Sequence, residues 1–218
     1  MSAVLAERTV AGLHDSLTRR VQEMIRPGEP ILDVGCGTGA WLKRLRELGF
    51  TNLHGTDLDT AQFALANATL SANDLNGESW TLAGQRFRLI TAIEVIEHLQ
   101  NIENFFRNLH RHLDDRGLCL MTTPNIHSLH ARLRYLLTAD MKQFGRIGDP
   151  THVFPVLGAT LDRLSARHGF EIAQQWGYPD TGDCVGARAW VNATVRVLRR
   201  VLPEPISGDV YCILLRKR

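Results

Sequence analysis

The chain has 218 residues, of which 44% are hydrophobic and 22% are charged, and its formal net charge is +2. This length suits one α/β domain with a buried core and is too short for two substantial domains, so we expect residues 1–218 to fold as a single domain. The small net charge gives no support for a nucleic-acid partner. The four cysteines form no Cys-x-x-Cys pair and no stretch has the length of a membrane span, which argues against a disulfide framework, a zinc knuckle and a transmembrane protein. The expected location is cytoplasmic.

Helical and strand-like patterns alternate in the first half of the chain. Apolar residues recur at helical spacing over 4–25, which predicts a leading helix within 1–28. An apolar strand at 30–34 then runs into a glycine-rich turn, and a helix is expected at 41–48. The other elements predicted in this half are strands at 52–56, up to 73, at 87–93 and at 117–122, and helices at 61–68 and 102–113.

The second half continues the alternation and adds one irregular segment. That segment, 138–155, is polar, contains glycine and has no periodicity, so it is the expected lid of a site. The predicted elements are helices at 128–137, 157–168 and 187–202, and strands at 170–176 and 209–215. Such spacing requires crossover connections, so the predicted fold is α/β: a single doubly wound, Rossmann-like domain with a seven-stranded, mostly parallel sheet. Residues 29–125 would form its cofactor-binding half and residues 126–218 its acceptor side.

The turn from Gly35 to Gly39 follows a strand and begins a helix, which lets a ligand approach the backbone at the carboxyl end of a sheet. Glycine spacing alone also fits a dinucleotide site or a structural bend. Asp57 ends the next predicted strand, where a carboxylate can accept hydrogen bonds from both hydroxyls of a ribose. Asp74 follows the third, where it can accept from an adenine amino group. The alternatives are a helix N-cap for Asp57 and a turn residue for Asp74.

Three segments resemble motifs of the class I S-adenosylmethionine-dependent methyltransferases. ILDVGCGTG at 31–39 is similar to their first motif, GTDLD at 55–59 to the motif after the second strand, and FRLITAIE at 87–94 to their fourth strand. The resemblance implies S-adenosyl-L-methionine as the cofactor and an antiparallel last strand in the sheet. A dinucleotide-binding dehydrogenase is disfavoured, because the turn reads G-x-G-x-G rather than G-x-G-x-x-G.

The same resemblance implies which residues contact the cofactor. Those expected on the methionine side and near the sulfonium are Gly35, Gly37, Gly39 and Ile93. Those expected to hold the ribose and flank the adenine are Asp57, Asp74 and Leu75. Three further residues of these motifs complete the expected cofactor site: Asp33, Cys36 and Leu58. Arg88 departs from the family pattern, which usually has an acid there.

An acidic segment that contains a histidine follows the fourth predicted strand. If it coils into a turn, Glu94, Glu97 and His98 share one face at i, i+3 and i+4, and His152 in the irregular segment could supply a fourth group. Two hypotheses follow. The four residues bind a divalent metal such as Mg²⁺, or Glu97, His98 and His152 act as acid and base without a metal. The alternatives are helix-start acids and packing histidines.

EVIEHL at 94–99, with TTPN at 122–125, resembles two branches of the family. One is the ubiquinone-biosynthesis-like O-methyltransferases, in which a Glu-Glu-His cluster is thought to bind Mg²⁺. The other is the small-RNA 3′-terminal 2′-O-methyltransferases, which typically have Asn-x-Glu-Tyr-Asn where this chain has Asn-Ile-His-Ser at 125–128. The resemblance to the first branch implies O-methylation of a small-molecule or glycan hydroxyl. The alternatives are a small-RNA 2′-O-methyltransferase and a cofactor-binding regulatory module without catalysis.

The helix predicted at 187–202 is amphipathic and rich in arginine. Most helices of this kind cover the core of their own domain, and we expect this role here. Peripheral contact with a membrane surface or a lipid-linked acceptor is the alternative. No pattern in the sequence indicates the oligomeric state.

Overall fold

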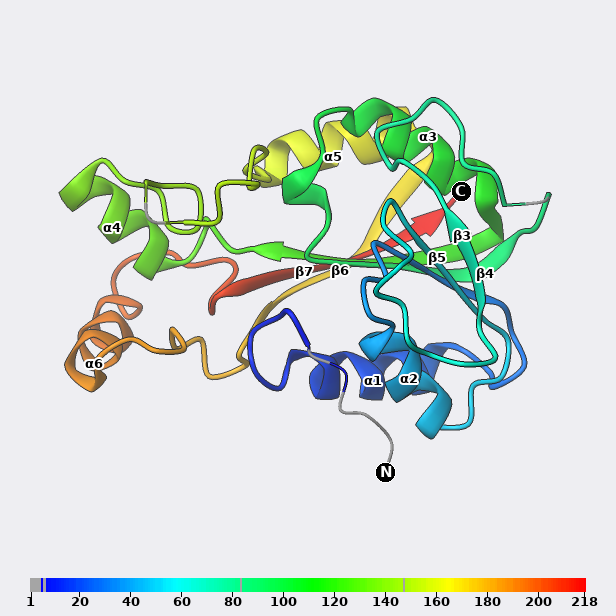
Figure 1. Ribbon diagram of the computed structural model, residues 1–218. Coiled ribbons are helices and arrows are strands. Elements are labelled where there is room, and N and C mark those ends of the chain that lie inside the picture. The colour runs from blue at the N-terminus through cyan, green and yellow to red at the C-terminus, as the bar shows by residue number, and fades with distance from the viewer. Residues whose placement is uncertain (1–4, 6, 83, 147) are drawn as a thin grey trace.

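The computed structural model describes residues 5, 7–82, 84–146 and 148–218, and it contains a seven-stranded sheet between helices (Figure 1). The strand order is β3-β2-β1-β4-β5-β7-β6. The strands are β1 (Ile31–Val34), β2 (Leu53–Asp57), β3 (Thr69–Ala72), β4 (Phe87–Ile93), β5 (Leu113–Pro124), β6 (Phe170–Tyr178) and β7 (Val210–Lys217). β7 runs antiparallel to both of its neighbours, while β1 to β5 pair in parallel. The predicted fold is confirmed, including the antiparallel last strand.

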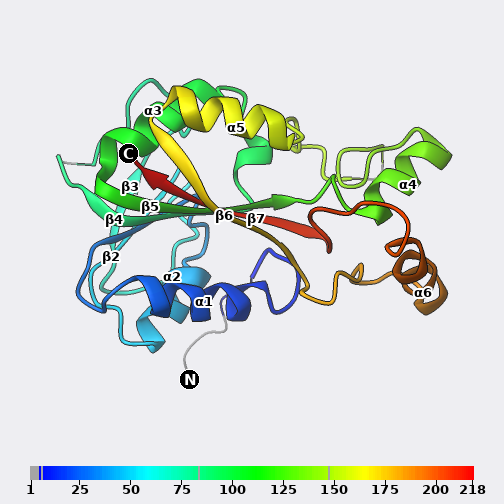
Figure 2. The same ribbon diagram turned by 180° about the vertical axis from the view of Figure 1, so that it is seen from behind.

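Helices cover both faces of the sheet. α1 (Leu13–Met24) and α2 (Ala40–Glu47) lie against one face, and α3 (Ile102–His112) and α5 (Gly158–Arg167) against the other (Figure 2). β1 is buried throughout because Ile31 packs in the α1–α2 layer and Leu32 in the α3–α5 layer. Burial on both faces explains why this parallel strand is a continuous apolar run.

Two predicted helices differ from the structure in the first half. The leading helix begins only at Leu13, because Gly12 adopts a left-handed conformation and the residues before it lie along a pocket. Residues 1–4 and 6 lie outside the described part. The helix predicted at 61–68 is wrong: the structure describes this whole segment as turns and irregular chain. Phe63 and Leu65 both approach Gly39, a spacing of two residues that a helix would place on different faces.

The last two helices to be placed are α4 (Leu129–Thr138) and α6 (Ala189–Leu198), which lie together at one end of the molecule (Figures 1 and 2). The expectation that the arginine-rich helix covers the core is wrong. All residues of α6 are described, and Val195 alone among them is buried. In the described part of the chain, no helix is long and apolar enough to cross a membrane.

From β1 the sheet continues through β2 and β3 on one side, and from β4 it continues through β5, β7 and β6 on the other side. The direction in which the sheet extends therefore reverses between β1 and β4. In open α/β sheets the crevice at such a switch point, at the carboxyl ends of the strands, is where ligands bind. The site is therefore expected beyond Val34 and Ile93, the last residues of these two strands.

Candidate functional site

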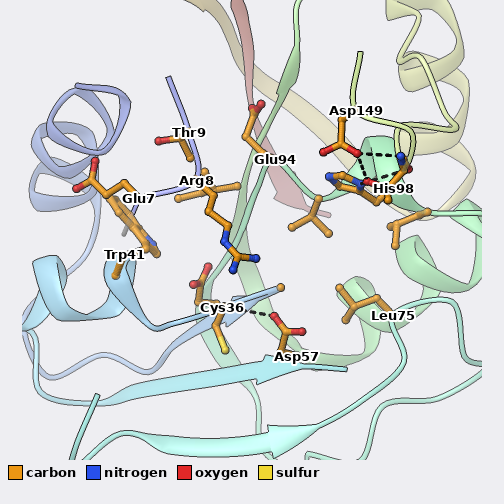
Figure 3. A pocket seen from close by; sticks show the side chains of 18 of the residues that line it. Glu7, Arg8, Thr9, Cys36, Trp41, Asp57, Leu75, Glu94, His98 and Asp149 are labelled. Carbon is orange, nitrogen blue, oxygen red and sulfur yellow. Dashed lines mark hydrogen bonds between the residues drawn. The ribbon is translucent and has the colours of Figure 1, made fainter. Parts of the chain in front are cut away.

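A pocket of about 840 Å³ lies at this switch point (Figure 3). It is lined by twelve of the residues singled out from the sequence: Asp33, Gly35, Cys36, Gly37, Asp57, Leu58, Asp74, Leu75, Ile93, Glu94, His98 and His152. The structure thus brings the glycine turn, the two acids after it and the histidine cluster to one cavity. Gly39 and Glu97 lie outside this lining.

The glycine turn has a backbone that only glycine adopts readily. Gly35, Gly37 and Gly39 have φ values of 71°, 50° and 85°, in the left-handed region. A Cβ on Gly35 would lie 2.7 Å from Val95, and one on Gly39 would lie 2.9 Å from Phe63, so these two glycines permit tight packing. A Cβ on Gly37 would meet no atom within 4 Å. Gly37 therefore leaves open space in the pocket wall, while Gly39 caps α2 behind it.

Asp57 braces the turn from the end of β2. Its Oδ2 accepts a hydrogen bond of 2.8 Å from the backbone N–H of Gly37, and its Oδ1 accepts one of 3.2 Å from Asp59. No helix follows in 58–68, so the N-cap alternative is wrong. A carboxylate has about four acceptor positions, so Asp57 can still accept from a bound ligand.

Asp74 forms a turn at the wall of the pocket. Its Oδ1 accepts from Asn76 N–H at 2.9 Å, and its carbonyl accepts from Gly77 N–H at 3.0 Å, so it does form a turn. It also lines the pocket beside Leu75.

Asp33 is a buried acid under the pocket, near the end of β1. Its Oδ1 accepts a hydrogen bond of 2.7 Å from the Thr91 hydroxyl, which accepts in turn from Trp41 Nε1 at 3.1 Å. Burial, together with the nearby carboxylate of Asp57, raises the pKa of Asp33 to about 7. The side chain is therefore near its point of half-ionisation at neutral pH.

A segment from the start of the chain forms another wall of the pocket. Arg8 extends into the cavity above Cys36 and Asp57, with Glu7 and Thr9 beside it (Figure 3). Glu7 forms an ion pair with Arg44 of α2, which fixes the segment to the helix that the glycine turn begins. This wall could not be predicted from the sequence, because the apolar residues of the segment continue the helical spacing of α1.

The acid and histidine cluster begins with a strained residue. Glu94 has φ 53°, and its Oε1 accepts from the Thr122 hydroxyl at 2.9 Å. The following residues form a short 3₁₀ helix, η1 (Ile96–His98). The backbone carbonyl of Glu97 accepts from Val153 N–H at 2.8 Å and from Phe154 N–H at 2.9 Å. These two bonds hold the irregular segment against η1 and bring His152 to Glu97.

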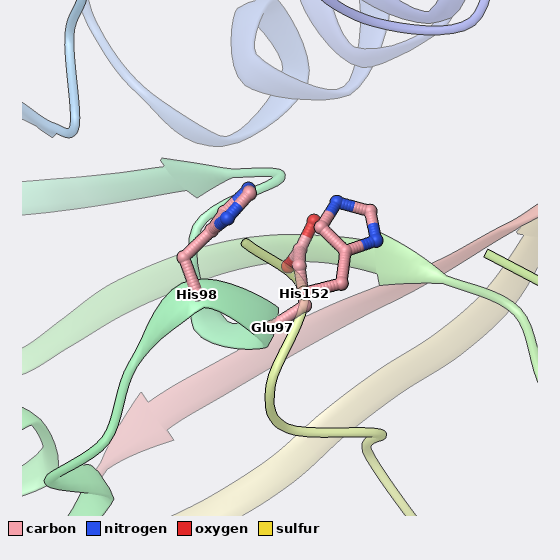
Figure 4. A group of neighbouring side chains, drawn as sticks. All are labelled: Glu97, His98 and His152. Carbon is pink, nitrogen blue, oxygen red and sulfur yellow. The ribbon is translucent and has the colours of Figure 1, made fainter. Parts of the chain in front are cut away.

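Glu97, His98 and His152 offer three ligand atoms within 4.8 Å of one another (Figure 4). Glu94 is not part of this group, so the predicted four-residue set is corrected to three. Neither carboxylate oxygen of Glu97 has a hydrogen-bond partner, although the residue is completely buried. Burial and the nearby Glu94 carboxylate raise the pKa of Glu97 well above its usual range. Burial therefore disfavours the ionised form of Glu97 when no cation is bound.

Both histidines have one ring nitrogen fixed by a backbone carbonyl. His98 Nδ1 lies 3.2 Å from Thr151 O, and His152 Nδ1 lies 3.0 Å from Gln143 O. Since a carbonyl can only accept, both Nδ1 atoms carry a proton, so in the neutral form of either ring the free lone pair lies on Nε2. Burial, with the neighbouring His152, lowers the pKa of His98 and favours this neutral form.

A second contact orients His98. Thr151 Oγ1 lies 2.8 Å from His98 Nδ1 and donates its own proton to Asp149 Oδ1 at 2.6 Å. Asp149, Thr151 and His98 thus form a chain of hydrogen bonds that ends at the pocket (Figure 3). Asp149 and Thr151 are site residues that were not predicted; their only signal in the sequence is their position beside His152.

The sequence matches the family model described as "Methyltransferase domain" over residues 6–175. The chain belongs to this methyltransferase family. It is 31% identical over 103 residues to a ubiquinone biosynthesis O-methyltransferase of Rickettsia canadensis (strain McKiel), and the match covers 44% of this chain and 42% of that relative. The methyltransferase thus matches less than half of the length of that curated relative.

Solved structures support the fold of this methyltransferase. A SAM-dependent methyltransferase from Archaeoglobus fulgidus aligns with a TM-score of 0.64 and 18% identity, covering 94% of each chain. Magnesium protoporphyrin IX methyltransferase from Synechocystis PCC 6803, solved with bound SAH, aligns with a TM-score of 0.59 and 15% identity, covering 94% of this chain and 82% of that one. Family and fold agree: the chain belongs to the methyltransferase domain family, has the fold of solved SAM-dependent methyltransferases, and is similar over part of its length to a ubiquinone biosynthesis O-methyltransferase.

Proposed function

We propose that this methyltransferase acts on a hydroxyl group of a small-molecule or glycan acceptor. The observation that carries the proposal is the pair of imidazoles of His98 and His152 in the pocket wall, each with Nδ1 directed at a backbone carbonyl, which leaves Nε2 as the atom that can accept a proton. A hydroxyl must lose its proton when it is methylated, so a hydroxyl acceptor needs a proton acceptor of this kind nearby. The likeness to O-methyltransferases supports the same acceptor class.

The glycine turn and Asp57 suit S-adenosyl-L-methionine. The open space at Gly37, which a side chain would fill, allows a ligand to lie against the backbone, and Asp57 keeps acceptor positions for ribose hydroxyls. When bound, this cofactor supplies a methyl group activated by the positive sulfonium. The chain's own task is to align the acceptor oxygen with it and to exclude water. Good alignment of this kind can contribute on the order of 7–11 kcal/mol to lowering a barrier.

The proposal includes a divalent metal held by Glu97, His98 and His152. The two unpartnered oxygens of Glu97 and the two Nε2 lone pairs fit a cation, and ligating histidines usually donate their other N–H to a carbonyl or carboxylate. Two imidazoles with one carboxylate suit zinc, iron or manganese better than Mg²⁺, which prefers oxygen ligands. Such a cation would make an acceptor hydroxyl more acidic. Without it, His98 would take the proton directly.

Calorimetric titration with S-adenosylhomocysteine, followed by methyl transfer to a panel of phenolic, catecholic and sugar hydroxyls, tests the function. Transfer to a hydroxyl compound is expected, together with loss of activity in His98→Gln. Binding of the product without transfer to any acceptor would favour a regulatory module. Strongly salt-dependent binding of oligonucleotides would favour an RNA substrate.

Dialysis against a chelator separates the two mechanisms. If the metal takes part, activity falls on dialysis and returns when Zn²⁺ or Mn²⁺ is added. Unchanged activity after dialysis, together with full activity of Glu97→Ala, would eliminate the metal from the proposal.

A further inference from the structure

Helices α4 and α6 are held together as one unit beyond an end of the sheet (Figures 1 and 2). The carboxylate of Glu204 accepts from the backbone N–H of Leu129, at the start of α4, at 2.6 Å. The same carboxylate forms an ion pair with Arg199, which follows α6. Arg132 of α4 donates to the carbonyl of Pro203. We call the exposed part of residues 129–140 and 183–204 the α4–α6 surface.

Large apolar side chains are concentrated on this surface. Of the twelve large hydrophobic residues that are exposed in the described part of the chain, eight belong to it. Leu136 and Leu137 are each 79% exposed, and Trp190 is 65% exposed. The others are Tyr135, Val185, Val197, Val201 and Leu202. A concentration of this kind marks an interaction surface, since single exposed apolar residues are normal but clusters are not.

The same surface is basic. Its two segments contain six arginines and three acidic residues, a net charge of +3 on a chain whose total is +2. Three of the arginines pair with these acids: Arg134 with Asp140, Arg196 with Asp183 and Arg199 with Glu204. Within the described ranges, Arg132, Arg188 and Arg200 have no acidic partner. A partner that matches this surface therefore has both an apolar region and negative charge.

We propose that the α4–α6 surface docks on an anionic lipid bilayer. Apolar and aromatic side chains among arginines are the composition of helices that lie in the interface, where the apolar groups enter the acyl region and the arginines meet phosphate. Five of the eight exposed apolar side chains belong to the two short helices themselves, and the other three lie in the chain next to α6. Docking goes beyond the methyltransferase activity and does not depend on the proposed acceptor.

Docking has a consequence for the acceptor that does rest on the proposed function. Residues 138–155 continue directly from α4 and contribute Gln143, Thr151 and His152 to the pocket. The acceptor side of the pocket is therefore connected to the docking surface by a short length of chain. A lipid-soluble hydroxyl compound is the acceptor that this arrangement suits.

Flotation of the full chain with vesicles tests the docking. Binding is expected to phosphatidylcholine vesicles that contain 30% phosphatidylglycerol, to be weak on phosphatidylcholine alone, and to fall at high salt. The fluorescence of Trp190 should report the docking, because this tryptophan is exposed on the α4–α6 surface. Of the other three, Trp41 and Trp80 are buried and the ring of Trp176 is covered by Arg20. A blue shift of the emission, quenched by brominated lipid and absent in Trp190→Phe, is expected. No binding to anionic vesicles at low salt would overturn the proposal.

Paired variants test the location. Each arginine near an anionic surface contributes about fivefold to membrane binding. Arg188→Gln/Arg200→Gln should therefore lower the partition coefficient between vesicles and water about 25-fold. Leu136→Ser/Leu137→Ser should also weaken binding at least tenfold. The matched control Arg111→Gln/Arg163→Gln removes two exposed charges from α3 and α5 and should have little effect.

Binding of S-adenosylhomocysteine and the far-ultraviolet spectrum should be unchanged in all of these variants, which excludes misfolding. If the control weakens binding as much as the α4–α6 variants, the assigned location is wrong. If the wild-type chain ignores vesicles but forms a dimer that Leu136→Ser/Leu137→Ser disrupts, the surface binds a second copy and the proposal is wrong.

Discussion

Replacing Asp33 by Asn should remove a pH dependence of stability from this protein. The pKa of Asp33 is raised from its ordinary value of 3.8 to about 7 by burial. Between these pH values the folded chain keeps a proton that the unfolded chain releases, so stability falls as pH rises through this window and levels off above pH 7. At 1.36 kcal/mol for each tenfold change in proton affinity, the full effect is about 4 kcal/mol. About 2.5 kcal/mol of it lies between pH 5 and pH 8.

Urea unfolding, followed by circular dichroism, would measure this effect in the wild type and in Asp33→Asn at several pH values. Asn keeps an oxygen that can accept from Thr91 but does not titrate, so the variant should gain stability relative to the wild type by about 2.5 kcal/mol from pH 5 to pH 8. Groups that titrate in both proteins cancel in this difference. The exposed Asp115→Asn controls for loss of a carboxyl group as such. A difference that stays constant, or that shrinks with pH, would refute the reasoning.

Three further predictions concern the pocket. Gly37→Ala should weaken binding of S-adenosylhomocysteine at least tenfold, because the methyl group enters the open space at the turn. Gly49→Ala is the control: its φ is also positive and its Cβ would also meet nothing within 4 Å, but it lies outside the pocket lining and should bind normally in the same calorimetric titration. Thr151→Val removes the hydroxyl that links His98 to Asp149 and should lower kcat roughly tenfold or more, while Thr151→Ser should retain most of the rate. Equal rates in the two variants would show that the hydroxyl does not orient His98. Glu97→Gln should abolish calorimetric binding of Zn²⁺ or Mn²⁺ without lowering the melting temperature, since neither carboxylate oxygen has a hydrogen-bond partner. Glu103→Gln, which removes a partly exposed carboxylate on the outer side of α3, is the control, and undiminished metal binding by Glu97→Gln would contradict the three-residue site.

Much of the sheet could be predicted because its strands are buried on both faces. β4 has the bounds expected from its apolar run. The glycine turn and Asp57 lie at the carboxyl ends of β1 and β2, as predicted, and both line the pocket. These features are local: each depends on a few consecutive residues and on the direction of a strand. The switch-point rule then brings them to one cavity.

The errors arise where distant contacts decide the structure. The helix expected at 61–68 gives way to turns because Phe63 and Leu65 pack on Gly39, more than twenty residues away. Glu94 lies outside the group of three ligand atoms, and its carboxylate accepts instead from Thr122 of β5. The chain from Trp41 through Thr91 to Asp33 joins three separate elements. No periodicity in the sequence reports such pairings.

The antiparallel direction of β7 has a practical consequence. β7 begins beside Pro124, at the end of the strands where the pocket lies, and runs to Arg216 beside Leu118, toward the opposite end of the strands. Arg218 therefore lies far from the cavity, whereas residues 7–10 form part of its wall. An affinity tag or fluorescent label attached after Arg218 should leave ligand binding undisturbed. The same addition before Glu7 would lie next to the wall of the pocket and should weaken ligand binding.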